Sequence, residues 1–445
     1  MRTQIFLAST LYGVATLAAA LDSDCFGAAD RRILLVSNNA ATPETAPPLD
    51  RLPGFERLRD RFDDVVSWNE TIAPLHPGDW APRPDDVPLW ERHLRPLWGL
   101  GDDEIELAVE SIQVNPALAV CQIFTGAPVT VYADGLMSYG PTRNKLDPLV
   151  GTRIDRLLHL DLVPGLKPVL LTEFGVEPEL VPTDAFLKVL GELGGTASEL
   201  PALPEEPALL LGQYLSALGI LTAEEEERLH LRMLRGAVAL GHTRVVFKPH
   251  PSAPAGWSRA LREEAGTLGA ELTVLDTPVL AEVLYEHTRP ALVVGCFSTA
   301  LLTASALYGL PVARTGTGTL LERLTPYENS NRVPVTIVDA LLPGLDDREA
   351  VTGQRRGMTV EALSELVEAV SFAMQPRIRP DLRPAAERYL AAHLDTHARR
   401  YFKRRRLTSL ALPGGIPVQL GFIPRNAAVR RMARRARALG RAMGR

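Results

Sequence analysis

The sequence predicts an α/β protein with two Rossmann-like, doubly wound domains and a basic helical extension at the C-terminus. Short apolar runs alternate with helical patterns along most of the chain, as expected for parallel sheets. At 445 residues the chain exceeds one ordinary core and suits two domains. Its 46% hydrophobic and 23% charged residues are typical of globular proteins. We place the domains at residues 1–200 and 205–375, and the extension at residues 376–445.

The first domain begins with a predicted strand at residues 3–8 and a predicted helix at residues 14–21. The polar residues Gln4, Ser9 and Thr16 interrupt this apolar segment, which favours a β-α unit over a cleaved secretory signal. The elements that follow are predicted strands at 32–37, 64–68 and 127–132, and predicted helices at 89–98, 102–112 and 115–124.

A Gly- and Pro-rich segment at residues 194–207 is the predicted linker to a second β-α series. Its predicted strands are 208–214, 244–247, 272–275, 291–295 and 311–313. Its predicted helices begin at Thr222, Trp257, Pro278 (capped by Asp276 or Thr277) and Thr299. Two such series joined by one linker favour the GT-B architecture, in which two Rossmann-like domains face a cleft.

The first candidate for chemistry follows the predicted strand at 127–132. Asp134 stands at the strand end beside Gly135, where a carboxylate with a raised pKa can take a proton from a substrate hydroxyl. Tyr139 and Arg143, a few residues further on, are candidates for the same acceptor side. The alternative interpretation is an ordinary turn or helix-cap Asp.

The second candidate is the loop after the predicted strand at 244–247. It carries a cation, an imidazole between two prolines and a hydroxyl, contributed by Lys248, His250, Pro251 and Ser252. Open α/β sheets bind ligands at the carboxyl ends of their strands, and these groups suit a phosphate there. A second His-Pro pair, His76-Pro77, shows that the dipeptide alone is weak evidence. The alternative is a structural Pro-rich turn.

The third candidate is the strand-to-helix turn from Gly295 to Thr299. Gly295 permits close backbone approach, and Ser298 and Thr299 offer hydroxyls and free helix-start N–H groups that favour a phosphate. The alternative is ordinary Ser/Thr capping. With Asp134 on one sheet and two phosphate-type sites on the other, the sequence predicts an inverting sugar transfer from a nucleotide donor.

No metal site is predicted. The lone Asp22-Ser-Asp24 falls at a predicted helix end and is interpreted as surface. Cys25, Cys121 and Cys296 have no metal-ligand spacing, and three scattered cysteines favour a reducing compartment.

The ordered set Asp134-Gly135, His250-Pro251 and Ser298-Thr299 resembles the motifs of bacterial sialyltransferases, and the layout resembles the alpha-2,8-polysialyltransferase family. The resemblance covers residues 1 to about 375. It implies a GT-B enzyme of capsule polysaccharide synthesis that uses CMP-sialic acid as donor substrate, with no metal or other cofactor. By this resemblance, Asp134 is the general base, His250 assists the leaving phosphate, and Ser298 and Thr299 hold that phosphate.

One position departs from the family pattern, which usually has two acids before the glycine. This chain has Ala133 in the first place, so we assign the base to the acid next to Gly135. Contacts to the cytosine and to the sialic acid carboxylate are assigned to no single residue; the candidates are Gln213, Arg143 and Arg314.

The C-terminal extension is strongly basic. Residues 376–445 contain 18 Lys and Arg against three acids, a net charge of +15, whereas the whole chain is −5. Such a tail suggests a polyanion. The Arg clusters lack the aromatic residues that stack nucleic-acid bases, which favours an anionic lipid surface. A solvated helix without a partner is the alternative. The expected location is cytoplasmic, peripheral on the inner face of the plasma membrane.

Two other functions remain open at this point. CDP-glycerol-type glycerophosphotransferases of cell-wall polymer synthesis also have two such domains and His-Pro loops. A non-catalytic periplasmic sugar-binding protein would require the N-terminal segment to be a true secretory signal.

Overall fold

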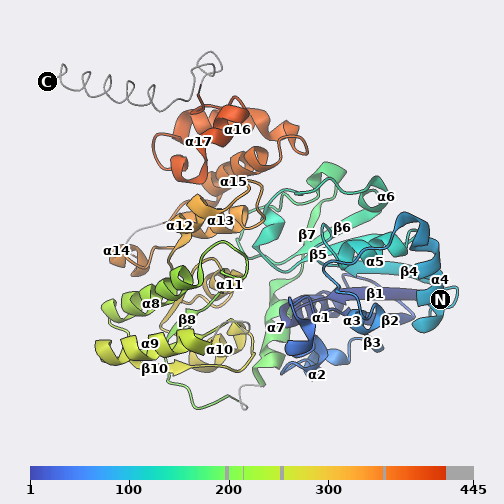
Figure 1. The fold of residues 1–445 in the computed structure, drawn as a ribbon, viewed down its shortest axis with the longest axis horizontal. Helices are drawn as coiled ribbons and strands as arrows, with labels where there is room; N and C mark the ends of the chain where they lie inside the picture. Colours follow the sequence, from blue (N-terminus) through green and yellow to red (C-terminus); the bar gives the residue numbers. More distant parts are fainter. Residues whose placement is uncertain (196–199, 214, 251–254, 354–356, 417–445) are drawn as a thin grey trace.

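The computed structural model describes residues 1–195, 200–213, 215–250, 255–353 and 357–416. Two separate sheets form its core, and all their paired strands are parallel (Figure 1). The predicted α/β class with two doubly wound domains is therefore confirmed.

The first sheet has seven strands in the order β3-β2-β1-β4-β5-β6-β7. These are β1 (Arg2–Ala8), β2 (Arg31–Val36), β3 (Asp64–Ser67), β4 (Glu104–Val109), β5 (Val129–Ala133), β6 (Ile154–His159) and β7 (Pro178–Leu180). The chain first winds outward from β1 through β2 and β3, then returns to β4 and winds the other way. The strand order therefore reverses between β1 and β4, where such sheets bind ligands.

The second sheet has five strands in the order β10-β9-β8-β11-β12. These are β8 (Ala208–Leu211), β9 (Arg244–Lys248), β10 (Glu271–Val274), β11 (Leu292–Gly295) and β12 (Val312–Arg314). Here the order reverses between β8 and β11, so this sheet offers a second ligand-binding edge.

Helices cover the faces of both sheets. In the first domain they are α1 (Leu11–Asp22), α2 (Glu56–Arg59), α3 (Trp68–Thr71), α4 (Val87–Leu97), α5 (Ala117–Ile123), α6 (Pro148–Gly151) and α7 (Thr183–Gly194). Those that follow β8 are α8 (Ala223–Ala239), α9 (Ala255–Leu268), α10 (Ala281–Thr288), α11 (Thr299–Ala306), α12 (Thr317–Arg323), α13 (Arg332–Leu341), α14 (Arg348–Val351) and α15 (Val360–Met374). None of the helices among the described residues is long and apolar enough to cross a membrane.

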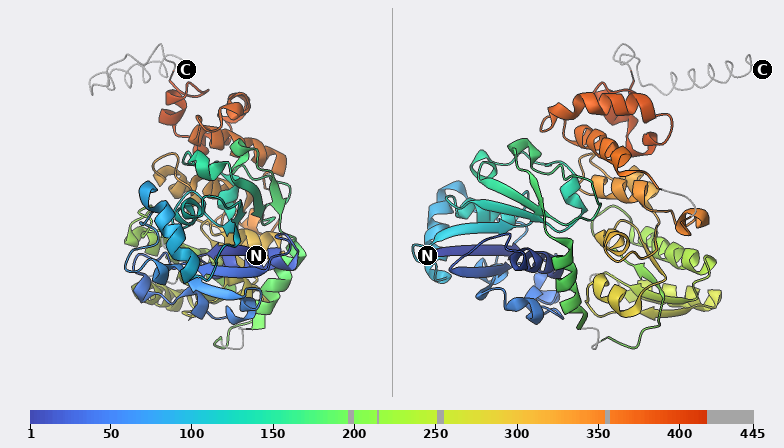
Figure 2. Two further views of the ribbon diagram at one scale, coloured as in Figure 1. Left: turned by 90° about the vertical axis from the view of Figure 1, so that its right-hand side faces the viewer. Right: turned by 180° about the vertical axis from the view of Figure 1, so that it is seen from behind.

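The two domains share one apolar core. Helix α7 packs against α1 of the first domain and α10 of the second, and it lies between the two sheets (Figure 2). The buried cluster on the α1 face of the first sheet continues into the second sheet. A second cluster fills the opposite face of the first sheet. Because burial is shared across the junction, each domain helps to fix the position of the other.

The described part of the basic extension folds back onto the second domain. Helix α16 (Arg383–His393) packs on α15, and α17 (Arg404–Ser409) follows a short 3-10 turn at Ala398–Tyr401. The Arg406 guanidinium donates to the carbonyl oxygens of Ala373 and Met374, and so caps the C-terminal end of α15. Part of the basic charge is thus used for internal contacts. The rest of the predicted helical extension, residues 417–445, lies outside the described residues.

Two predicted elements were wrong. Residues 102–112 were predicted as a helix but contain strand β4. Its side chains Ile105, Leu107 and Val109 alternate into one core cluster while Glu104 is exposed, a two-residue period that identifies a strand. The helix expected at Pro278 begins at Ala281, with Leu280 as its N-cap. Strands β6 and β7 were not predicted.

Candidate active site

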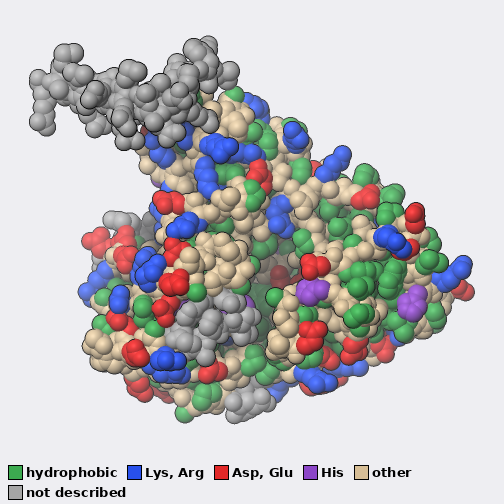
Figure 3. Space-filling view, in the orientation of Figure 1, with side chains coloured by type: hydrophobic (Ala, Val, Ile, Leu, Met, Phe, Trp, Pro, Cys, Tyr) green, Lys and Arg blue, Asp and Glu red, His purple; other side chains and the backbone are tan. Residues whose placement is uncertain are grey.

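A cavity of about 720 Å³ lies between the two domains, at the carboxyl ends of the strands of both sheets. Figure 3 shows the hollow between them on one face of the molecule. Two Rossmann-like domains facing one cavity constitute the expected GT-B architecture. We call the side contributed by the first sheet the acidic wall and the side contributed by the second sheet the donor wall.

The acidic wall is built from three neighbouring strand ends. Ser9 and Thr10 follow β1, Glu110 follows β4, and Asp134 follows β5, and all of them line the cavity. Thr10 also caps α1, because its hydroxyl accepts the N–H of Gly13 at 2.9 Å. The strand reversal between β1 and β4 therefore brings two carboxylates and the start of a helix to one place.

Both carboxylates of the acidic wall have perturbed proton affinity. Burial raises the pKa of Asp134 above its ordinary value, and a long hydrogen bond of 3.5 Å from the Thr10 hydroxyl opposes this only in part. Burial, together with the neighbouring charge of Asp134, raises the pKa of Glu110 to about 7. A raised pKa makes a carboxylate a stronger base near neutral pH, which is what proton abstraction from a hydroxyl requires.

The donor wall is likewise built from strand ends. Gln213 follows β8, Lys248 ends β9 with His250 two residues later, and Ser298 and Thr299 follow β11. All five residues line the cavity, as expected from the sequence.

Hydrogen bonds already organise this wall. The Gln213 side-chain carbonyl accepts the N–H of Phe297 at 3.0 Å, which ties the ends of β8 and β11 together. The Ser298 hydroxyl accepts the N–H of Ala300 at 3.3 Å and so caps α11. The ordinary capping role considered for Ser298 is thus present, and it leaves the start of α11 facing the cavity.

Burial favours the neutral forms of the basic side chains in the donor wall. It lowers the pKa of Lys248, an effect that the charge of Glu282 partly opposes. Partial burial and the adjacent Lys248 charge lower the pKa of His250, so its imidazole is neutral at pH 7. The wall therefore offers the Lys248 amino group and a neutral imidazole, both able to donate hydrogen bonds to a phosphate.

The two walls approach closely at Gly135. A Cβ built on Gly135 would lie 3.2 Å from the Thr299 hydroxyl oxygen of the opposite domain. The backbone of Gly135 is extended, with φ of −148°, so the glycine is needed here for space and not for conformation. The absence of a side chain at Gly135 lets the end of β5, next to Asp134, lie directly against the start of α11.

Arg143 lines the cavity and has a firmly held backbone. Its N–H donates to the Gln113 side chain at 2.5 Å, and its carbonyl accepts from the Gln375 side chain at 2.7 Å. Burial lowers the pKa of its guanidinium. Arg314, in contrast, is absent from the cavity lining and forms an ion pair with Asp339 at 3.1 Å, which identifies it as a structural residue.

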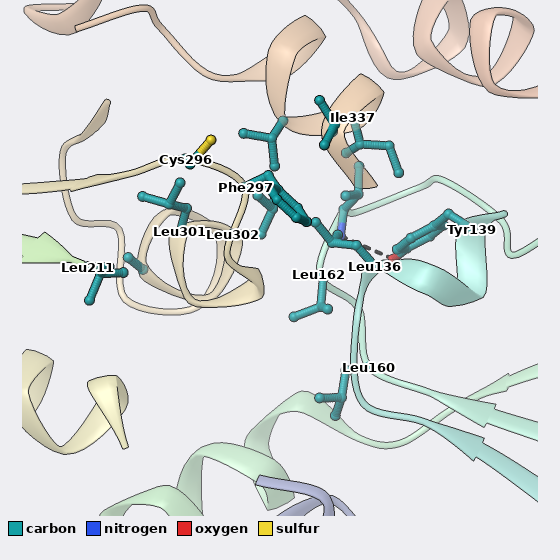
Figure 4. Close-up of a cluster of buried hydrophobic side chains, with 14 of the residues drawn as sticks. Leu136, Tyr139, Leu160, Leu162, Leu211, Cys296, Phe297, Leu301, Leu302 and Ile337 are labelled. Carbon is teal, nitrogen blue, oxygen red and sulfur yellow. Dashed lines mark hydrogen bonds between the residues drawn. The ribbon is translucent and has the colours of Figure 1, made fainter. Parts of the chain in front are cut away.

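Two predicted site residues point elsewhere. Tyr139 is fully buried in the shared core, where its hydroxyl accepts the N–H of Val163 at 3.3 Å (Figure 4). Gly295 makes room for the side chain of Leu301, 3.2 Å from a built Cβ, and not for a ligand. Neither residue appears in the cavity lining, because core packing holds the Tyr139 side chain and fills the space beside Gly295. Pro251 and Ser252 lie outside the described residues.

Two carboxylates were missed by the sequence analysis. Glu110 was hidden inside a segment predicted as helix, and Glu282 stands in the first turn of α10. Burial raises the pKa of Glu282 to about 7, and one of its oxygens has no hydrogen-bond partner among the described residues although the residue lines the cavity. Recognising the strand period of residues 104–109 would have placed Glu110 at a strand end.

Metal-binding groups are sparse in the described residues. No group of three His, Cys, Asp or Glu side chains there could hold a metal ion. Asp22, at the end of α1, instead pairs with Arg61 at 2.7 Å, and Asp24 is exposed.

The sequence model of the family described as Alpha-2,8-polysialyltransferase (POLYST) matches residues 4–317. The match spans both sheets and includes every described residue that we expected in the site. No curated protein matches the chain.

Several solved structures resemble the chain at low identity. The GT-B domain of the sialyltransferase from Photobacterium damselae is 12% identical, with 76% of this chain and 96% of that chain covered and a TM-score of 0.40. MurG from Acinetobacter baumannii is 11% identical (87% and 95% covered, TM-score 0.39). UGT2 from Phytolacca americana, complexed with UDP-2fluoro-glucose and pterostilbene, is 13% identical (87% and 100% covered, TM-score 0.38). At these values no residue role carries over.

Proposed function

The chain belongs to the alpha-2,8-polysialyltransferase family and is a glycosyltransferase, and we propose that its donor is CMP-sialic acid. The acceptor in this proposal is a hydroxyl group of a glycan, and transfer inverts the anomeric carbon without a metal ion. The observation that carries the proposal is that Asp134 on one wall and Lys248 and His250 on the other line the same cavity.

The proposed reaction starts at the acidic wall. Asp134 takes the proton of the acceptor hydroxyl as the acceptor oxygen bonds to the anomeric carbon of sialic acid. The bond between that carbon and the CMP phosphate oxygen breaks, and the phosphate oxygen keeps the electron pair. Attack and departure occur on opposite faces of the sugar, which gives inversion.

The donor wall stabilises the departing phosphate in this proposal. Negative charge grows on the phosphate oxygens in the transition state, and fixed donors that meet this charge lower the barrier. Those donors are the Lys248 ammonium, the neutral His250 imidazole and the N–H groups at the start of α11, beside Ser298 and Thr299.

The direct test is incubation with CMP-sialic acid and a panel of oligosaccharide acceptors, with and without EDTA. We expect acceptor-dependent release of CMP that EDTA leaves unchanged, and a product whose NMR spectrum shows the inverted anomer. A parallel incubation with CDP-glycerol tests the alternative. Transfer of glycerol phosphate, with no turnover of CMP-sialic acid, would reject the proposed donor.

We also propose that the basic C-terminal segment contacts an anionic membrane surface. Residues 417–445 contain eight Arg and no acid, and each basic residue near such a surface contributes about 1 kcal/mol. The part before residue 417 is unsuitable for deletion, because Arg400 and Tyr401 bond the buried Asp339 at 3.0 Å each. Truncation after Ile416 should therefore abolish flotation with phosphatidylserine vesicles and leave CMP release intact. Undiminished flotation of the truncated protein would remove the segment from membrane binding.

A further inference from the structure

Glu110 stands beside the proposed base on the same face of the first sheet. Strand pairing places Val109 opposite Val131, so Glu110 falls opposite Tyr132, two residues before Asp134. Side chains two apart on a strand share a face, which puts Glu110 and Asp134 on the α1 side. Glu110 is 7% exposed, and both carboxylates line the cavity.

Hydrogen bonds fix the position of the Glu110 carboxylate, but no basic side chain pairs with its charge among the described residues. The N–H of Ser9 donates to Oε1 at 2.7 Å, and the Ser9 hydroxyl donates to the same oxygen. The other oxygen, Oε2, lies 3.4 Å from a Cβ built on Gly13, so the absence of a side chain at Gly13 leaves room for it. Among the described residues no Lys or Arg forms an ion pair with Glu110. A buried carboxylate is therefore held next to a second one with no cation between them.

Residue 133, the place of the first acid in the family pattern, lines the cavity but lies on the other face of the sheet from Asp134. Ala133 packs against the cluster on the opposite face of the sheet. A longer side chain at residue 133 would extend from the face opposite Asp134, whereas Glu110 at the end of β4 extends from the same face as Asp134. The second acid of this site therefore comes from the adjacent strand.

We propose that Glu110 is a positioning residue for the base: its carboxylate repels the charge on Asp134, and this repulsion is relieved when Asp134 takes the acceptor proton. The role rests on the proposed function, because it presupposes that Asp134 is the base. Two buried carboxylates in contact cannot both ionise without cost, and such pairs hold one proton more tightly than either acid alone.

The surroundings contain little that would cancel this repulsion. The titratable groups that face Glu110 are Tyr132 and Asp134 from β5 and Tyr12 from α1, with Glu282 and Lys248 across the cavity. Burial raises the pKa of both Tyr12 and Tyr132, so these phenols stay neutral. The charge of Lys248 acts on Glu282, where it opposes the rise in pKa that burial causes.

The first test is the pH dependence of kcat/KM for Glu110→Gln. The amide keeps the shape and can still accept the Ser9 N–H, but it removes the charge. Removing the Glu110 charge takes away a repulsion that exists only where Glu110 is ionised, above its pKa of about 7. Asp134 should then be a weaker base there, so kcat/KM of the variant should fall relative to wild type at pH 8 and change little at pH 5. Glu106→Gln is the matched control, since Glu106 lies on the same face of β4 but pairs with Arg2 outside the cavity. An equal loss of kcat/KM at pH 5 and at pH 8 would overturn the proposal.

The second test needs no transferase activity. A folded-state pKa of about 7 for Glu110, against about 4.3 in the unfolded chain, means that the folded protein binds the proton more tightly. Stability is then highest below the unfolded value and is lost as pH rises toward 7. Glu110→Gln and Asp134→Asn should each raise Tm more at pH 8 than at pH 5. The double variant should gain less than the sum of the two single gains, because each change removes its own burial cost but both remove the same repulsion.

The two tests separate the proposals. Additive gains in Tm would show that the carboxylates do not interact, and would reject the role of Glu110 whichever sugar is transferred. Non-additive gains together with no turnover of CMP-sialic acid would support the carboxylate pair and reject the donor instead.

Discussion

The acidic wall and the donor wall of the cavity are built alike but carry different ionisable groups. Each is formed by strand ends at the point where the strand order of its sheet reverses. Burial raises the pKa of Glu110 and Asp134 on one wall and lowers the pKa of Lys248 and His250 on the other. The same physical cause thus makes the acids better bases and makes the cation and imidazole easier to neutralise. The difference suits one wall to proton removal and the other to phosphate.

The largest effect is expected from Asp134→Asn on the acidic wall. The amide cannot take a proton, so kcat should fall about a hundredfold or more. The affinity for CMP, measured by calorimetry, should stay within about twofold because the donor wall is untouched. Asp24→Asn, an exposed position, is the control for a general effect. If CMP binding falls as far as kcat, the two walls are not separate in function.

His250→Ala should affect chemistry and donor binding together. Loss of the imidazole removes a hydrogen-bond donor from the developing phosphate charge, and kcat should fall about a hundredfold. CMP should also bind more weakly. The chain offers a matched control in His76→Ala, which alters its other His-Pro pair. His76 contacts the Ala40 carbonyl at 2.9 Å, away from the cavity. Wild-type turnover of the His250 variant would remove that residue from the mechanism.

Glu282→Gln tests how the donor wall keeps its cation. Burial lowers the pKa of Lys248 and the charge of Glu282 opposes this. Without that charge the ammonium should lose its proton at lower pH, so CMP affinity should fall off earlier as pH rises from about 7 toward 10. The measurement is the Kd for CMP across this range, with Lys248→Met as the reference that lacks a titrating amine. Superimposable wild-type and Glu282→Gln curves would contradict the coupling.

The smallest effect is expected from Gly135→Ala at the contact between the walls. The added Cβ would lie 3.2 Å from the Thr299 hydroxyl, so that side chain must yield by a few tenths of an ångström. We expect kcat to fall a few-fold with little change in Tm. Gly126→Ala, where a Cβ meets nothing within 4 Å, is the control. Equal activity in both variants would mean that this close contact is unimportant.

The sequence by itself determined the fold class and the motif residues that line the cavity on both walls. Strand ends and the motifs at Asp134, His250 and Ser298 are local features, and a parallel sheet gathers the ends of its strands at one edge whatever the details of packing. Even the first β-α unit could be predicted, because polar residues such as Gln4 and Ser9 interrupt its apolar run.

Only the tertiary structure decided which side chains face the cavity and which carboxylates meet. Tyr139 follows β5 and Gly295 ends β11, but core packing occupies both positions. The Tyr139 hydroxyl accepts the N–H of Val163, and the Leu301 side chain fills the space beside Gly295. Glu110 joins Asp134 through the pairing of β4 with β5, and burial of both depends on the shared junction between the domains. Contacts between distant segments leave no local pattern in a sequence, and proton affinity follows from those contacts.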